Sequence, residues 1–120
     1  MAKHNELGKE GELQAITFLK TKGYKVLRTN YRYLKYEVDI ITQINGLIVV
    51  VEVKTRTSKD FGELQDFVKP AQIKSIIVAT DAYLQELDKE YEVRFDIVTV
   101  YKTENKFELE HIEDAFNSII

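Results

Sequence analysis

The chain has 120 residues, of which 44% are hydrophobic and 31% are charged, so it fits one domain over residues 1–120 with a core of its own. Cysteine is absent, which excludes disulfides, thiolate metal sites and thiol catalysis. No apolar run approaches the roughly 20 residues that cross a bilayer, and the first residues lack the apolar stretch of a signal peptide, so we expect a cytoplasmic protein without membrane contact.

The net charge of −3 does not by itself suggest a nucleic-acid-binding protein, but the charges are unevenly distributed. Residues 1–80 hold 13 Lys and Arg against 9 Asp and Glu, a balance of +4, whereas residues 81–120 hold 4 against 11, a balance of −7. The basic part permits weak, salt-sensitive phosphate contacts. A solvated surface with an acidic tail explains the same distribution.

The elements follow from the apolar spacing and from Gly, Pro and Asn-Gly signals. Gly23 after a Lys-rich turn is typical of a helix end, and Pro70 suits the first position of a helix. In chain order the prediction is a helix (5–22), a strand (24–33), two strands (37–44 and 47–54), a loop (55–68), a helix (70–87), a strand (93–101), and a short strand followed by one amphipathic helical turn (107–120).

Asn45-Gly46 between two β-rich runs is a strong hairpin signal, because both residues tolerate positive φ. If these two residues form the turn, Asp39 faces Glu52, and Glu37 faces Lys54. Side chains alternate along a strand, so these four are predicted to project from one face. The other face is predicted to be core, with Val38, Ile40, Thr42 and Ile44 against Val53, Val51, Val49 and Leu47.

Two acids that face each other across a hairpin need an explanation. Opposed residues have Cβ atoms about 4.5–5.5 Å apart, so Asp39 and Glu52 either share a proton or bind a cation. Carboxylate oxygens suit Mg²⁺ or Mn²⁺. The alternative is an edge strand with a solvated polar face, in which Lys54 neutralises the acids.

Glu12 is a second unusual acid, because it shares a helix face with residues that should pack on the sheet, namely Ala15, Ile16 and Leu19. Gly8 and Gly11 flank it and allow a strand or a phosphate backbone to approach closely. A boundary residue that reaches solvent explains Glu12 alone. Beside an acidic site, it becomes a candidate metal ligand.

Other residues fit contacts with nucleic acid. The cations beyond the hairpin could meet phosphates, although each also fits an ordinary surface; they are Arg56, Lys59, Lys69 and Lys74. Gln72 lies between Lys69 and Lys74 in the sequence and is a further candidate contact with nucleic acid. Three basic residues alternate with tyrosines in a pattern that suits nucleic-acid binding or a half-buried edge strand: Arg28, Arg32 and Lys35 with Tyr31, Tyr33 and Tyr36.

An ordered set of motifs over residues 5–101 resembles the YraN family, a group of small bacterial proteins. The matching segments are Gly8-x-x-Gly11-Glu12, Asn30-Tyr31-Arg32, Glu37-Val38-Asp39-Ile40-Ile41, Val51-Glu52-Val53-Lys54-Thr55-Arg56, Phe61-Gly62 and Arg94-Phe95-Asp96. The resemblance implies a restriction-endonuclease-like α/β fold, distantly similar to Holliday junction resolvases. Its mixed central sheet would be flanked by helices in the order α-β-β-β-α-β.

The resemblance also implies roles for individual residues. Asp39, Glu52 and Lys54 match the PD-(D/E)xK nuclease signature, and Glu12 matches the acid on the first helix. There are two departures: Tyr36 stands where the family usually has Gly, and Gln72 stands where a Lys is common.

The leading hypothesis is a metal-dependent endonuclease acting on DNA, with branched DNA as one candidate substrate. Asp39 and Glu52 would bind Mg²⁺ or Mn²⁺ with the Val53 carbonyl, Glu12 would complete an outer or second metal site, and Lys54 would orient the attacking water and stabilise phosphate charge. The alternative is a non-catalytic nucleic-acid-binding or scaffolding module. A hydrolase of other phosphate compounds is a third interpretation, and a symmetric homodimer is compatible with all three.

Overall fold

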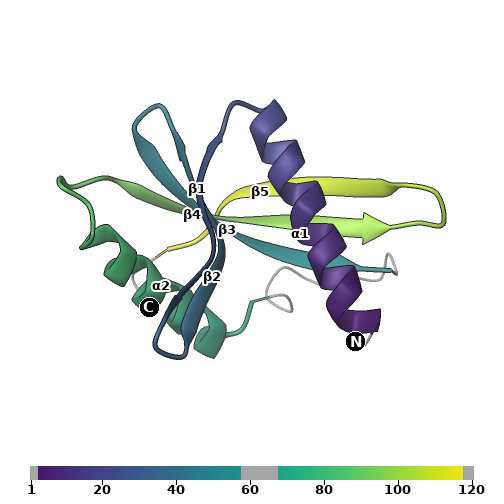
Figure 1. The fold of residues 1–120 in the computed structure, drawn as a ribbon, viewed down its shortest axis with the longest axis horizontal. Helices are drawn as coiled ribbons and strands as arrows, with labels where there is room; N and C mark the ends of the chain where they lie inside the picture. Colours follow the sequence, from purple (N-terminus) through teal and green to yellow (C-terminus); the bar gives the residue numbers. More distant parts are fainter. Residues whose placement is uncertain (1–2, 58–67, 118–120) are drawn as a thin grey trace.

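The structure is a computed structural model, and it describes residues 3–57 and 68–117, with side chains from residue 6 onward. It is a mixed α/β structure in which helices flank one five-stranded sheet (Figure 1). The elements are α1 (Lys3–Thr21), β1 (Lys25–Tyr33), β2 (Tyr36–Ile44), β3 (Leu47–Arg56), α2 (Pro70–Leu84), β4 (Val93–Lys102) and β5 (Phe107–Phe116). The predicted order is confirmed as far as β4, and most of the predicted loop (55–68) lies outside the described residues.

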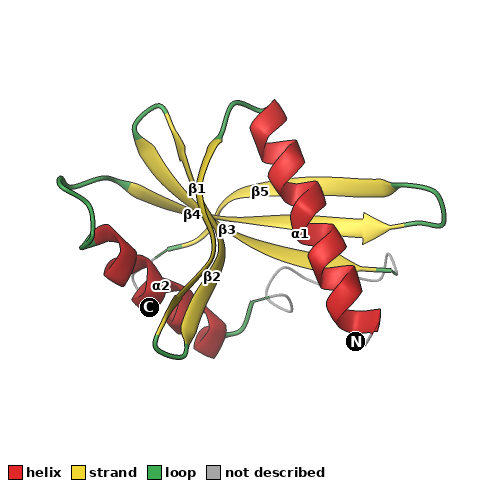
Figure 2. Cartoon of the chain, viewed as in Figure 1, coloured by secondary structure: helices red, strands yellow, loops and turns green. Residues whose placement is uncertain are grey.

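The strands lie in the sheet in chain order, and only β3 and β4 run parallel. Parallel neighbours need a crossover connection, and α2 lies in that crossover. The helices cover opposite faces of the sheet (Figure 2). α2 packs on a buried cluster that includes Ile41 and Val50, whereas α1 packs on one that includes Ile40 and Val51. Within the described ranges, no helix is long and apolar enough to span a membrane.

The C-terminal region differs from the prediction. The expected helical turn after a short strand is wrong as far as residue 117, because β5 continues to Phe116 and pairs with β4. The pairing register shifts between Phe95 and Ile97, where Asp114 takes a positive φ of 53°. The backbone N–H of Asp114 donates to the buried carboxylate of Asp96 at 3.0 Å, so a side chain on β4 holds this irregular stretch in the sheet.

α1 approaches β3 closely at a glycine. A Cβ placed on Gly11 would lie 1.9 Å from Thr55 Oγ1 and 2.9 Å from Thr55 Cβ, so a side chain there must push the helix and strand apart. A Cβ placed on Gly8 would meet nothing within 4 Å. Gly11 therefore serves the close approach of a strand, whereas the approach of a phosphate backbone at Gly8 stays a prediction.

Replacing Gly11 with Ala is expected to lower the free energy of unfolding by about 1–3 kcal/mol, because Thr55 Cβ cannot rotate away. Gly8→Ala is the matched control, and we expect it to stabilise α1 by up to ~1 kcal/mol through helix propensity. Chemical denaturation followed by circular dichroism measures both variants. Equal stability changes of the same sign would contradict the close packing at Gly11.

Candidate active site

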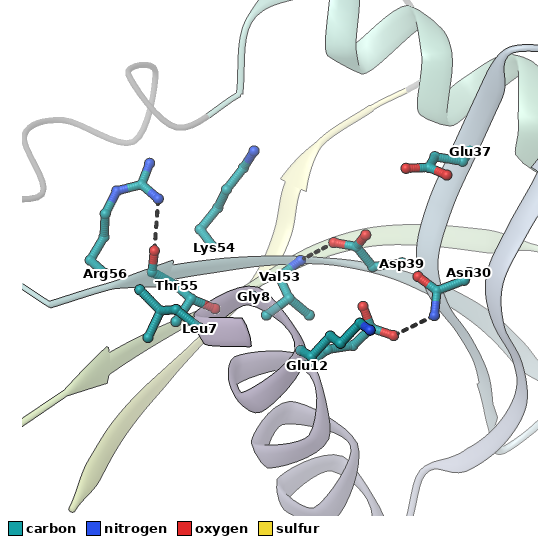
Figure 3. Close-up of a pocket in the computed structure, with 11 residues that line it drawn as sticks. Leu7, Gly8, Glu12, Asn30, Glu37, Asp39, Val53, Lys54, Thr55 and Arg56 are labelled. Atoms are coloured by element: carbon teal, nitrogen blue, oxygen red, sulfur yellow. Dashed lines mark hydrogen bonds between the residues drawn. The ribbon is translucent and has the colours of Figure 1, made fainter. Parts of the chain in front are cut away.

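The candidate site lies where β2 separates from β3. Residues 40–44 pair with residues 47–51 in the predicted register, and that ladder ends there. The N–H of Val53 donates instead to Asp39 Oδ2 at 2.8 Å (Figure 3). In an antiparallel strand, the N–H and C=O of one residue point to the same neighbour, so the Val53 carbonyl faces the same gap as Asp39. The Asp39 carboxylate therefore takes the place of the β2 carbonyl that would accept the next backbone hydrogen bond of the β2–β3 ladder.

The predicted faces of β2 are wrong at this point. Val38 packs with Ile41 in the cluster under α2, whereas Ile40 packs under α1. Residues two apart share a face in a regular strand, so β2 changes face between Val38 and Ile40. Asp39 lies at this change. Its side chain therefore lines the pocket beside α1 and still reaches the acid on β3.

Asp39 and Glu52 are brought together as a carboxyl pair. Glu52 is buried, Asp39 is half-buried, and a hydrogen bond joins the two carboxyl groups. Burial, followed by the charge of Asp39, raises the pKa of Glu52 to about 9. Burial also raises the pKa of Asp39, although its bond from Val53 acts in the opposite direction. The pair therefore retains a proton at neutral pH unless a cation replaces it.

Gln72 of α2 forms hydrogen bonds with both Glu52 and Lys54 of β3. Its amide nitrogen donates to Glu52 Oε2, and its amide oxygen accepts from Lys54 Nζ at 2.9 Å. Lys54 Nζ also lies 3.8 Å from Glu52 Oε2. The structure places the amide of Gln72 between Glu52 and Lys54, and its expected contact with nucleic acid stays a prediction. The helix thus fixes the separation of Glu52 and Lys54.

Glu12 approaches the same pocket from α1. Its Oε1 accepts a hydrogen bond from Asn30 Nδ2 at 2.7 Å. Burial raises the pKa of Glu12, the bond from Asn30 lowers it, and the charges of Asp39 and Glu37 raise it. No role was predicted for Asn30, which has a φ of 52° within β1. Asn is uncommon inside strands, and that is the sequence signal that could have marked it.

The pocket between α1, β2 and the end of β3 has a volume of about 550 Å³. Its lining, drawn in Figure 3, is Leu7, Gly8, Lys9, Glu12, Asn30, Glu37, Asp39, Val53, Lys54, Thr55 and Arg56. In the described part of the chain, no three His, Asp or Glu side chains are grouped closely enough to hold a metal ion. Mg²⁺ commonly takes only one or two carboxylates, with water and phosphate oxygens completing its shell. The Asp39–Glu52 pair meets that requirement without Glu12.

Of the remaining predicted contact residues, Arg56 lines this pocket, whereas Lys69 and Lys74 are not among the residues that line it. Arg56 is exposed at the end of β3, where its Nη1 donates to the Thr55 carbonyl at 2.9 Å. Lys69 precedes α2 and Lys74 lies on its exposed side. Lys59 lies outside the described residues. Contact of these cations with nucleic acid stays a prediction.

Comparison with known proteins gives a family and several relatives. Residues 11–100 match the model of "Uncharacterised protein family UPF0102". The chain is 52% identical to the UPF0102 protein FP2501 of Flavobacterium psychrophilum and 50% identical to a UPF0102 protein of Flavobacterium johnsoniae, over 97% of this chain and 98% of each relative. The crystal structure of SSO0001 is similar over 97% of this chain, with 17% identity and a TM-score of 0.44. This chain matches 54% of the SSO0001 chain, about half its length.

Proposed function

The chain belongs to UPF0102, the YraN family, and from that premise we propose that it is a divalent-metal-dependent endonuclease that hydrolyses phosphodiester bonds in DNA. The observation that carries the proposal is the buried carboxyl pair of Asp39 and Glu52, with Lys54 held beside it. Two acids in contact suit a divalent cation. The order of the elements and the mixed sheet support a restriction-endonuclease-like core, in which Asp39, Glu52 and Lys54 fit the PD-(D/E)xK signature.

Asp39 and Glu52 would hold the metal, and the Val53 carbonyl, which faces the gap between β2 and β3, would be a further ligand. Bound Mg²⁺ or Mn²⁺ lowers the pKa of a coordinated water and offsets the phosphate charge. Asp39 and Glu52 would give up their shared proton to hold such an ion, so that both carboxylates would carry their charge. Val53 N–H holds Asp39 in place through its hydrogen bond to Oδ2.

Among the described residues, Lys54 is the cation that Gln72 links by hydrogen bonds to Glu52. Its ammonium group would donate hydrogen bonds to a phosphate oxygen and orient the attacking water. Gln72 acts as a positioning residue, because its amide bonds both Lys54 and Glu52. Glu12 would act from the other wall of the pocket, either at an outer metal position or by orienting water.

The proposal is tested by cleavage assays on linear duplex, single-stranded and four-way-junction DNA. We expect cleavage with Mg²⁺ or Mn²⁺, none with EDTA, and a loss of at least ~100-fold for Asp39→Asn. The asparagine oxygen can still accept from Val53 N–H, so the fold should persist. Asp81→Asn, on the exposed side of α2, is the matched control and should cleave as wild type.

Three results would be decisive against the endonuclease. Equal cleavage by wild type and Asp39→Asn would place the activity elsewhere. DNA binding without cleavage under any divalent metal, unchanged in Asp39→Asn, would favour the non-catalytic module. Metal-dependent hydrolysis of nucleotides but not of DNA would favour a hydrolase of other phosphate compounds.

A further inference from the structure

The turn between β1 and β2 presents bulky apolar side chains to solvent. We call residues 32–35 the hairpin tip. Leu34 is 73% exposed and its neighbour Tyr33 is 44% exposed. Among the residues that the structure describes, the other large hydrophobic side chain exposed to a similar degree is Leu13, at 64%. Adjacent exposed apolar side chains on a protruding turn are typical of a contact surface.

Neither packing nor backbone conformation explains a leucine at this position. Leu34 has a φ of 58°, in the left-handed region that is unfavourable for a residue with a Cβ. Glycine or asparagine would relieve that cost in a turn. The leucine side chain gains no burial in exchange, since it lies mostly in solvent. A role in contacting a partner would account for it.

The charges around the hairpin tip favour an anionic partner. Residues 28–36 contain Arg28, Arg32 and Lys35 and no Asp or Glu, and Arg28 forms a half-exposed ion pair with Glu86 at 3.8 Å. Arg32 pairs with Glu37 at 3.1 Å, but both side chains are more than half exposed, so the pair is weak and easily exchanged. Lys35 Nζ lies 5.5 Å from the centre of the Tyr36 ring. The tip therefore combines apolar side chains with flanking cations.

The hairpin tip is also close to the candidate site along the chain. β2 runs directly from the tip to Glu37 and Asp39. At about 3.3 Å per residue, Leu34 lies within ~17 Å of Asp39, which is about five base steps of 3.4 Å. In Figure 1 the turn lies at the lower edge of the view, as do the N-terminal ends of α1 and α2. One DNA molecule could therefore contact both features.

We propose that the hairpin tip is a wedge that recognises DNA at a branch point, where Leu34 enters an open base step and Tyr33 stacks on an exposed base. Apolar wedges open base steps, and aromatic side chains bind unstacked bases. This inference rests on the proposed function and names its substrate class as DNA with locally unstacked bases. It places the cut within about five nucleotides of the branch.

The wedge is tested with Leu34→Gly, because glycine accepts the left-handed φ and removes only the side chain. The DNA is a fork with 2-aminopurine at the branch, compared with a linear duplex of the same composition. Binding is followed by fluorescence anisotropy and base opening by aminopurine fluorescence, both in EDTA and in Ca²⁺, and cleavage of the same DNA is followed on a gel in Mg²⁺ and in Mn²⁺. Leu13→Ala is the control for losing an equally exposed leucine.

We expect wild type and Leu13→Ala to prefer the fork and to raise the aminopurine fluorescence. Leu34→Gly should bind the fork about tenfold more weakly, bind the duplex equally and keep its melting temperature. That pattern without cleavage by any variant would support the wedge and contradict the endonuclease. Cleavage with unchanged fork binding and fluorescence in Leu34→Gly would overturn the wedge alone. A wild-type dimer that becomes monomeric in Leu34→Gly would also overturn it, because the tip would then bind a second copy.

Discussion

Glu52→Gln is expected to abolish cleavage and, in EDTA at pH 8, to raise the free energy of unfolding by about 1–3 kcal/mol. In the proposed endonuclease, activity falls because the amide is a poor metal ligand. Stability rises because the amide mimics the protonated acid and can donate to Asp39 where the shared proton lies in wild type. The site thus lowers the stability of the metal-free fold, as expected where function requires like charges in contact.

The pH dependence follows from the same pair. The pKa of Glu52 is about 9 in the folded protein and about 4.5 when unfolded, so the folded state binds an extra proton between these values. Metal-free wild type should therefore lose stability as pH rises from about 5 to 9. Glu52→Gln should lack this part of the pH dependence.

Thermal and urea unfolding at several pH values in EDTA measures the effect. Glu37→Gln is the matched control, because its side chain is exposed and forms a surface ion pair with Arg32. It should change the free energy of unfolding by less than about 1 kcal/mol. A Glu52→Gln protein that is less stable than wild type at pH 8 would contradict the shared proton.

Asp96→Ala is expected to cause the largest loss of stability, about 3–5 kcal/mol, because it removes the buried carboxylate that accepts hydrogen bonds from Arg94, His111 and the Asp114 N–H. Asp96 has no exposed surface and its carboxylate accepts four hydrogen bonds. Arg94 donates two of them at 2.8 Å, His111 Nε2 donates one at 2.7 Å, and the Asp114 N–H donates the fourth. Without the carboxylate, these donors lose their acceptor. The irregular stretch of β5 also loses the hydrogen bond that holds it to β4.

Urea denaturation compares Asp96→Ala with Glu113→Ala. Glu113 also pairs with Arg94, at 3.4 Å, but its side chain is 55% exposed, so its loss should cost less than about 1 kcal/mol. Equal costs for the two variants would show that burial of Asp96 does not decide the effect.

Burial raises the pKa of Asp96, but the hydrogen bonds from His111, Arg94 and Asp114 outweigh it and lower the pKa overall. Asp96 should therefore stabilise the fold above about pH 4 and lose that contribution below it.

The hairpin and the order of the elements could be predicted because their signals are local. Asn45-Gly46 specifies the turn, and with it the register as far as Val51. The change of face at Asp39 could not be predicted, since alternation assumes a regular strand. It lies opposite Asn30, whose left-handed backbone has no unique sequence signature.

The contacts of the site could be predicted only in part. Asp39 and Glu52 are neighbours across a short hairpin, so their meeting follows from register. Gln72 reaches Glu52 from a helix, 20 residues away in the sequence, and no periodicity specifies which residue of α2 faces Glu52. The Arg94–Asp96 pair could likewise be predicted only in part. Both residues belong to a motif of the sequence, but the burial of Asp96 and its hydrogen bond from His111 depend on the position of β5.

The parallel pairing of β3 with β4 has a consequence for how the protein matures. The two β-turns of the first half can close quickly because their contacts are local, but β4 can join β3 only after a long crossover has been ordered. Gln72 belongs to that crossover, so the lysine and the acid it holds stay unaligned until the second half of the molecule docks. A nascent or partly unfolded chain would thus carry every acidic group of the pocket and still lack a working arrangement.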